Sequence, residues 1–192
     1  MLKNLRIKRL LFLTVLALAF VGCSSSQAEK PNTETEFSAM DLMFAVMMIP
    51  HHEQATVMAA LALENSNNEK ILDLAQRIKD GQALEITQMQ GWLDKTGVSS
   101  DSKTDDHAMH GGMMGGMATE EEIEELSKLS SPEFDLLFLD LMILHHEGAI
   151  QMVEMIQNSA NPEVKKLSQD IIEVQNSEIQ EMKNLRTAIS GD

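Results

Sequence analysis

An internal duplication limits what this 192-residue chain can fold into. The two copies contain the segments MMIPHHEQATVM, at 47–58, and LMILHHEGAIQM, at 141–152, which align without a gap. Identical residues recur 94 positions apart through these segments, and 93 positions apart further along. Residue identity at a fixed offset is typical of a repeated structural unit. The fold is therefore expected to consist of two similar halves.

Each half is predicted to form a helical hairpin. In the first helix, apolar residues recur at i, i+3 or i+4, and i+7, which places them on one helical face. Polar breaks at 65–69 and 158–163 separate it from a second helix, predicted at 69–95 and 163–189. Pro50 interrupts the first helix and predicts a kink there. Two such hairpins make an all-α, antiparallel four-helix bundle, consistent with an aromatic content of only 4%.

The N-terminus has the features of an export signal. Residues 1–22 combine a basic start with an apolar run too short for a comfortable membrane span. With Cys23 directly after it, the segment resembles a bacterial lipoprotein signal, which is cut before a cysteine that then carries lipid. An ordinary secretory peptide, or a retained single-span anchor, is the alternative. We expect a membrane-anchored lipoprotein on the extracytoplasmic face, with residues 23–36 as a flexible tether and 37–192 as the bundle.

Charge and cysteine content exclude several classes of function. The net charge of −15 becomes about −19 if residues 1–22 are removed, because they hold four positive charges and no negative one. Such an acidic body disfavours nucleic acid and anionic lipid as partners. Cys23 is the only cysteine, so thiolate metal sites and cysteine nucleophiles are excluded once it is lipidated. Any soft metal ligand must then come from the 15 methionines.

The duplicated His-His-Glu triplets, flanked by methionines, predict a metal site in the bundle. A methionine four residues before a histidine shares its helical face, so the two can hold one ion. Hairpin geometry brings a glutamine and a glutamate of each second helix to the level of the triplet, as hydrogen-bond partners. The candidate ligands are His51, His52, His145, His146, Met48, Met58, Met142 and Met152, supported by Gln82, Glu85, Gln175 and Glu178.

Imidazole and thioether together suit Cu(I), Ag(I) and, with more imidazole, Cu(II). Zinc and iron fit less well, because zinc does not need methionine and the Glu-x-x-His motif of di-iron bundles is absent from the sequence. Copper sequestration or delivery, without catalysis, is therefore the favoured function. A ferritin-like di-metal oxidase or peroxidase is one alternative. A structural or partner-binding bundle is another, since buried histidines and methionines also serve in ordinary cores.

A glycine-rich linker at about 97–119 joins the halves. It contains HAMHGGMMGGM, in which histidine and methionine are spaced by glycine. This segment is either a low-complexity spacer or an accessory site for a soft cation. Methionine is an unusual choice for a spacer, which favours the accessory site. Its candidate ligands are His107, Met109, His110, Met113, Met114 and Met117.

The two copies resemble domain-of-unknown-function family 305, a family of exported bacterial proteins with a ferritin-like helical bundle. The resemblance rests on a methionine before His-His, then Ala and Met, with Gln and Glu-Ile-x-x-Met in the next helix. The first copy carries this as Met48, His51-His52, Ala55 and Met58, then Gln82, Glu85-Ile86 and Met89; the second as Met142, His145-His146, Ala149 and Met152, then Gln175, Glu178-Ile179 and Met182. The match covers about residues 37–190. It implies a four-helix bundle and, as in some members, copper binding outside the cytosol.

Overall fold

The computed structural model describes residues 36–99 and 114–191, which form one compact unit. The described residues contain helices and no strand, so the predicted all-α class is confirmed. The signal segment and Cys23 lie outside the described residues. The helices are α1 (Ala39–Asn65), α2 (Glu69–Thr96), α4 (Glu120–Lys128), α5 (Glu133–Val153) and α6 (Pro162–Ser190).

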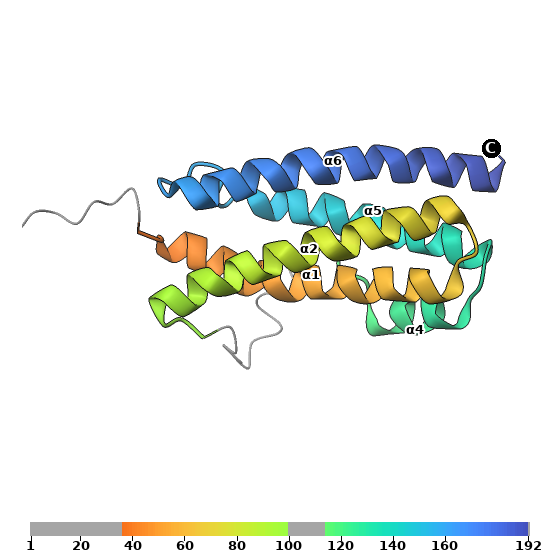
Figure 1. Cartoon of the computed structure of the whole chain (residues 1–192), viewed down its shortest axis with the longest axis horizontal. Helices are drawn as coiled ribbons and strands as arrows, with labels where there is room; N and C mark the ends of the chain where they lie inside the picture. The colour runs from red at the N-terminus through yellow and green to blue at the C-terminus, as the bar shows by residue number, and fades with distance from the viewer. Residues whose placement is uncertain (1–35, 100–113, 192) are drawn as a thin grey trace, which may run out of the picture. The chain divides into compact units, whose positions relative to one another are not determined.

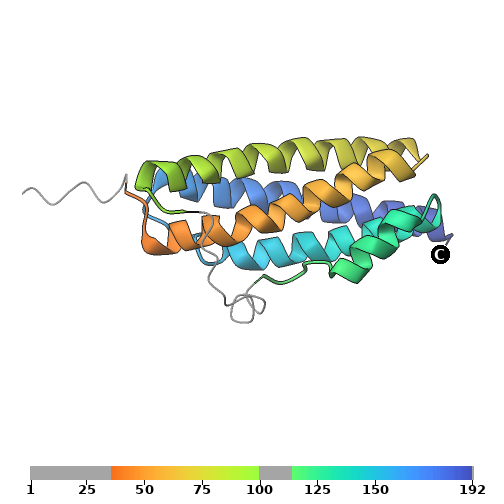
Figure 2. The same cartoon turned by 90° about the horizontal axis from the view of Figure 1, so that it is seen from below.

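The four long helices form two antiparallel hairpins, as the duplication predicts. α1 packs along α2, and α5 packs along α6 (Figure 1). The two hairpins meet mainly through α1 and α5, while α2 and α6 touch each other less. Figure 2 shows the short helix α4 beside α1 and α5, on the side of the bundle away from α2 and α6. The histidine-bearing helices α1 and α5 are therefore the inner pair of the fold.

Local sequence signals set the helix ends. Ser38 and Asp41 form a capping box at the start of α1, where each side chain accepts a hydrogen bond from the other residue's backbone N–H. Asn161 caps α6, whose first residue is a proline. Gly97 ends α2 with a φ of 71°, a left-handed conformation that favours glycine. α1 continues through the exposed Pro50 as one helix.

The interior is aliphatic and rich in methionine. Its largest fully buried side chains include Trp92, Phe44, Phe134 and Phe138. α5 is long and apolar enough to cross a membrane, but 61% of its apolar window is buried within the bundle. Such burial is typical of a core helix in a helical bundle. α5 therefore holds its two histidines away from water.

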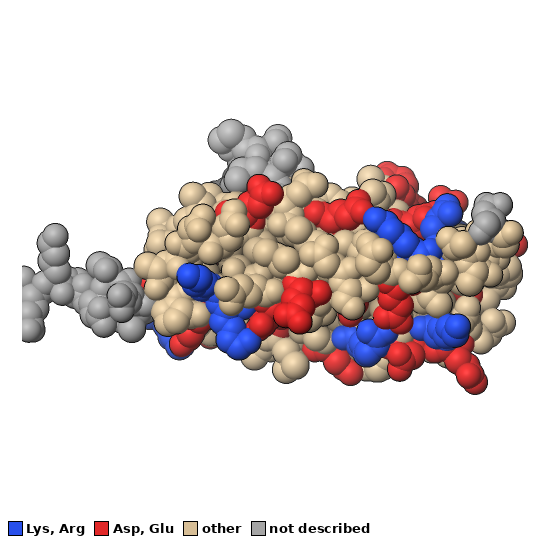
Figure 3. Space-filling view, turned by 90° about the horizontal axis from the view of Figure 1, so that it is seen from above, with Lys and Arg blue, Asp and Glu red and all other residues tan. Residues whose placement is uncertain are grey.

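Acidic and basic side chains form mixed groups on the surface of the bundle. On the face drawn in Figure 3, acidic and basic groups alternate with broad neutral areas. Some of the pairs are one helical turn apart, such as Lys166 with Asp170 and Lys128 with Glu124. Exposed pairs of this kind contribute about 0–1 kcal/mol each. The stability of the fold rests on the buried core instead.

α4 and the turn before it were not predicted from the sequence. Thr119 and Glu122 form a capping box at the start of α4. Their spacing, Thr-x-x-Glu, is a recognisable helix-start signal at the end of the segment that composition assigned to the linker. Residues 114–119, here named the strap, run back over α1 and α5 and join α4 to the bundle. The strap therefore covers one side of the histidine-bearing helices.

Candidate metal centre

All four histidines of the duplicated triplets are fully buried. His51 and His52 lie on α1, and His145 and His146 lie on α5, each with 0% of its surface exposed. The rings of His51 and His145 are in contact across the helix pair, with centroids 3.8 Å apart. Each of these two rings lies 6.3 Å from its neighbour in sequence, His52 or His146. The structure thus brings the four imidazoles together in the middle of the bundle.

Each imidazole is held through the same ring atom, Nε2. His52 Nε2 lies 2.6 Å from Glu85 Oε2, and His146 Nε2 lies 2.9 Å from Glu178 Oε2. The inner pair uses backbone carbonyls instead. His51 Nε2 lies 3.1 Å from the Gly115 oxygen, and His145 Nε2 lies 2.9 Å from the His51 oxygen. Since carbonyl and carboxylate oxygens accept hydrogen bonds, each Nε2 carries the proton and donates it.

The other ring nitrogen, Nδ1, is buried without a hydrogen-bond partner in all four histidines, among the residues that the structure describes. Native interiors leave few buried polar atoms unpaired, and each one costs about 1–3 kcal/mol. Four matching examples at repeat-related positions therefore need an explanation. A histidine that ligates a metal through one nitrogen almost always donates its other N–H to a carboxylate or a carbonyl. The four imidazoles have that arrangement, with Nδ1 as the free lone pair.

Burial keeps the inner pair in the neutral form that metals require. The pKa of His51 is lowered from 6.5 to about 4, mainly by desolvation; the hydrogen bond to the Gly115 carbonyl opposes this shift, and the neighbouring His52 and His146 add smaller contributions to it. Burial likewise holds the pKa of His145 well below its usual value, with His51 as the next cause. Both rings are therefore uncharged at neutral pH. A neutral imidazole with its proton on Nε2 has an available electron pair on Nδ1.

The strap closes the side of this site that faces away from α2 and α6. Gln54 exchanges two hydrogen bonds of 2.8 Å with the backbone of Ala118. In the second copy, the position of Gln54 is taken by Gly148, and a Cβ there would lie 1.8 Å from the Gly115 oxygen. A Cβ on Gly116, which has a φ of 80°, would lie 2.1 Å from the Leu144 oxygen of α5. Glycine at these positions lets the strap lie directly on α5 and bring a carbonyl to His51.

The methionines of the motif divide into two groups related by the duplication. Met58 and Met142 lie in one buried cluster, and Met48 and Met152 lie in another. Met182 belongs to the first cluster and its counterpart Met89 to the second, although sequence reasoning did not count either among the ligands. The first cluster contains three thioethers and the second contains four, since Met47 also belongs to it, and each cluster has sulfurs from both halves of the chain.

The four supporting residues have two different roles. Glu85 and Glu178 bind His52 and His146, as the hairpin geometry predicts. Gln82 and Gln175 are buried at the same level, with 4% and 3% of their surface exposed. Neither bonds a histidine: both polar side-chain atoms of Gln82, and Oε1 of Gln175, have no hydrogen-bond partner among the described residues.

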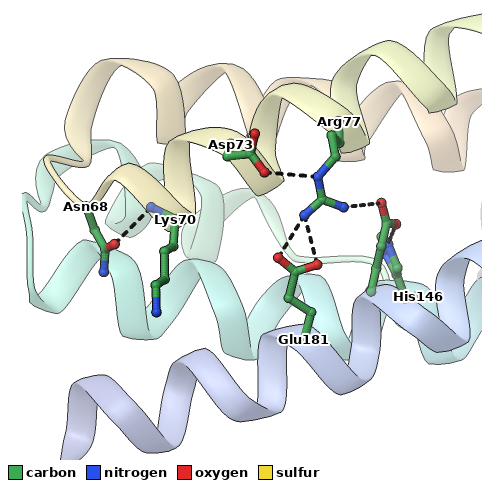
Figure 4. A network of polar contacts seen from close by, with 7 residues as sticks. Asn68, Lys70, Asp73, Arg77, His146 and Glu181 are labelled. Atoms are coloured by element: carbon green, nitrogen blue, oxygen red, sulfur yellow. Dashed lines mark hydrogen bonds and ion pairs between the residues drawn. The ribbon is translucent and has the colours of Figure 1, made fainter.

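Arg77 distinguishes the two His–Glu pairs. It reaches from α2 to α6, with Nη2 at 2.7 Å and 2.8 Å from the two carboxylate oxygens of Glu181 (Figure 4). Its Nη1 also lies 3.9 Å from Oε1 of Glu178, the glutamate that binds His146. The repeat-related position to Arg77 is Asp170, so the other pair has no equivalent arginine.

The accessory residues are only partly described. His107, Met109, His110 and Met113 lie outside the described residues. Met114 packs against the cluster that contains Met48, and Met117 is half-buried in the strap. Within residues 36–99 and 114–191, no three His, Cys, Asp or Glu side chains converge as a metal-binding group. An ion at the imidazoles would therefore need the thioether sulfurs as well.

Comparison with known proteins agrees with this architecture. The family model described as Domain of unknown function (DUF305) matches residues 41–186. The chain belongs to the DUF305 family. A DUF305 fragment from Deinococcus radiodurans is 32% identical, with a TM-score of 0.72 over 80% of this chain and 99% of the fragment. A DUF305 protein from Streptomyces coelicolor is 31% identical, with a TM-score of 0.69 over 76% of this chain and 89% of that protein. No curated protein matches the sequence closely enough to count as a relative.

The structural neighbours include CopM with metal bound. CopM in its Cu(II)-bound form is 32% identical to this DUF305 protein, with a TM-score of 0.66 over 77% of this chain and 96% of CopM. CopM has also been solved in Cu(I)-bound and Ag-bound forms, with TM-scores of 0.64 and 0.60.

Proposed function

We propose that this protein binds copper in the cell envelope, as Cu(I) or Cu(II), and that it sequesters or delivers the ion without catalysis. The four buried Nδ1 atoms carry the proposal, because all four belong to imidazoles held at Nε2 in the manner of metal ligands. Thioether sulfur is soft and favours Cu(I) and Ag(I) over zinc or calcium. The Cu(I)-, Cu(II)- and Ag-bound forms of CopM support the same choice of ion.

The proposed ligands are the four histidines with the methionines of the two clusters. His51 and His145 are in ring contact, so an ion bound at their Nδ1 atoms would draw ligands from both halves of the duplication. The sulfurs of Met48 and Met152, and those of Met58 and Met142, would complete the coordination from the cluster on either side. In the accessory segment, Met114 and Met117 would pass ions to the bundle, and their position in the strap supports this role.

Export and lipid anchoring at Cys23 complete the proposal. The basic and apolar segment before Cys23 supports both, and a copper protein outside the cytosol would rely on methionine and histidine where thiols oxidise. Labelling of the expressed protein with a radioactive fatty acid tests the anchor. Label that is lost in a Cys23→Ser variant supports it, and label that persists contradicts it.

A di-metal oxidase is less well supported. Such a centre takes several carboxylates, whereas no three His, Cys, Asp or Glu side chains converge as a metal-binding group within the described part of the chain. A purely structural bundle leaves the four unpaired Nδ1 atoms without an explanation.

The test is a Cu(I) titration of the mature protein against a competing chelator. Met48→Leu removes a buried sulfur at nearly constant volume, and Met43→Leu removes a sulfur that is 36% exposed on the same helix. We expect Met48→Leu to weaken Cu(I) retention by about tenfold or more, because even a supporting partner of a metal ligand contributes that much. Met43→Leu should retain copper like the wild type. A wild-type protein that retains no copper would refute the proposal.

A further inference from the structure

A small opening lies between α2 and α6, on the opposite side of the histidines from the strap. Its volume is about 30 Å³, enough for at least one water-sized species. Two repeat-related pairs of polar side chains line it, Gln82 with Gln175 and Glu85 with Glu178. Arg77 also lines it, as does the exposed Gly81. The opening is thus formed by the second helices of both halves.

The two glutamines indicate that the opening accepts a polar guest. Gln82 is 96% buried, yet neither its amide nitrogen nor its amide oxygen has a partner among the described residues. The amide oxygen of Gln175 is in the same state. A buried amide without partners is unfavourable by about 1–3 kcal/mol, so these groups need a ligand or water to offset that cost. Both glutamines line the opening, and their amide oxygens can act as ligands for a cation there.

The two glutamates connect the opening to the histidines. Oε2 of Glu85 bonds His52, and Oε2 of Glu178 bonds His146. The side chain of Glu85 is 19% exposed and that of Glu178 is 9% exposed, whereas the imidazoles behind them have no exposed surface. A cation that approaches from this side therefore meets the carboxylates first. From the other side, the strap lies on α5 and occupies Nε2 of His51.

We propose that the α2–α6 opening is the access route for the metal ion, and that the amide and carboxylate oxygens of its two residue pairs form a capture site for a hydrated divalent cation. This inference rests on the proposed copper binding. Oxygen ligands suit a hydrated Cu(II) ion. They bind the ion more weakly than imidazole does, so that it can move on to the histidines. The guanidinium of Arg77 lies near Oε1 of Glu178, so it competes with the incoming cation for that carboxylate oxygen.

Stopped-flow quenching of tryptophan fluorescence by Cu(II) tests the route. Trp92 is the only tryptophan, and it lies in the buried cluster that contains Met48 and Met152. Gly81→Leu should narrow the opening without strain, because a Cβ at Gly81 meets no atom within 4 Å. Gly91→Leu is the matched control: it is on the same helix, its Cβ also meets no atom within 4 Å, and it does not line the opening.

We expect Gly81→Leu to slow quenching by about tenfold or more, and to slow release to a chelator by the same factor, so that the dissociation constant is unchanged. Gly91→Leu should give wild-type rate constants. Equal rates in the two variants would overturn the access route and leave copper binding intact. A wild-type protein without quenching or copper retention would instead refute the proposed function itself.

A second pair of variants tests the competition by Arg77. Arg77→Gln removes the cation beside Glu178, and Lys70→Gln removes a cation from the same helix at a residue that does not line the opening. We expect faster copper loading in Arg77→Gln than in Lys70→Gln, because only the former frees a capture oxygen. Identical acceleration in both would mean that net charge alone sets the rate, which contradicts a role for Arg77 at the opening.

Discussion

The metal-free protein should lose stability on mild acidification because of one histidine. Burial lowers the pKa of His51 to about 4 in the folded state, whereas an imidazole in an unfolded chain titrates near 6.5. Between these values the unfolded chain binds a proton that the folded protein does not bind. The free energy of unfolding therefore rises with pH across this window and falls as the pH drops from 6.5 toward 4.

The size of the effect follows from the two pKa values. One pKa unit corresponds to about 1.4 kcal/mol, so His51 alone should remove about 3 kcal/mol between pH 7 and pH 4. His145 acts in the same direction, because burial lowers its pKa as well. The assay is urea unfolding of metal-free protein at pH 7, 5.5 and 4.5, for the wild type and for His51→Leu. At an m-value of about 2 kcal/mol/M, the wild-type midpoint should fall by about 1 M more than that of the variant.

The variant separates this effect from the protonation of carboxylates, which both proteins share. The neutral leucine removes the buried proton acceptor, so His51→Leu should show the weaker pH dependence. If wild type and variant lose the same free energy of unfolding, His51 is not held neutral in the fold and the buried site is wrong as described.

Three further predictions concern the metal and the strap. Copper retention, measured by equilibrium dialysis, should persist to about pH 5, because protons compete with the ion at the inner imidazoles only near the lowered pKa; a loss centred at pH 6.5 would contradict this. Glu178→Gln keeps an acceptor for the imidazole but not its charge, and should weaken copper binding by about 10–100-fold in a chelator competition; wild-type affinity would contradict the role of this carboxylate. Gly148→Ala places a Cβ against the Gly115 oxygen and should destabilise the protein by about 1–3 kcal/mol in thermal unfolding. Gly91→Ala, with open space at its Cβ, should be neutral or stabilising by about 0.5–1 kcal/mol, and equal effects of the two alanines would show that the strap is not packed on α5.

The duplication and the helical periodicity were enough to predict the fold class and the level of the site. A hairpin fixes which residues face one another at a given height, so the sequence could place a glutamine and a glutamate near each triplet, and the structure shows that the glutamates are the ones bonded to histidine. The helix boundaries also followed from local signals such as Asn161 before Pro162. These features depend on interactions within one helix or one hairpin.

The remaining features depend on contacts between the halves. The carbonyl partners of His51 and His145 are backbone atoms, which every residue has, so no pattern in the sequence distinguishes them. The packing of the strap was hidden because its glycines are typical of a flexible spacer as well as of close backbone contact. The replacement of Gln54 by Gly148 between the two copies was the available clue, since it removes a side chain where the strap meets α5.

Nitrogen NMR of the histidine side chains, recorded with and without Ag(I), tests the central claim most directly. Long-range proton–nitrogen correlation distinguishes the two ring nitrogens, and Ag(I) is diamagnetic. We predict that the metal-free protein shows His51 and His145 neutral with the proton on Nε2, and that one equivalent of Ag(I) shifts Nδ1 while Nε2 keeps its proton. A shift at Nε2 instead, or no change at either nitrogen, would contradict the account.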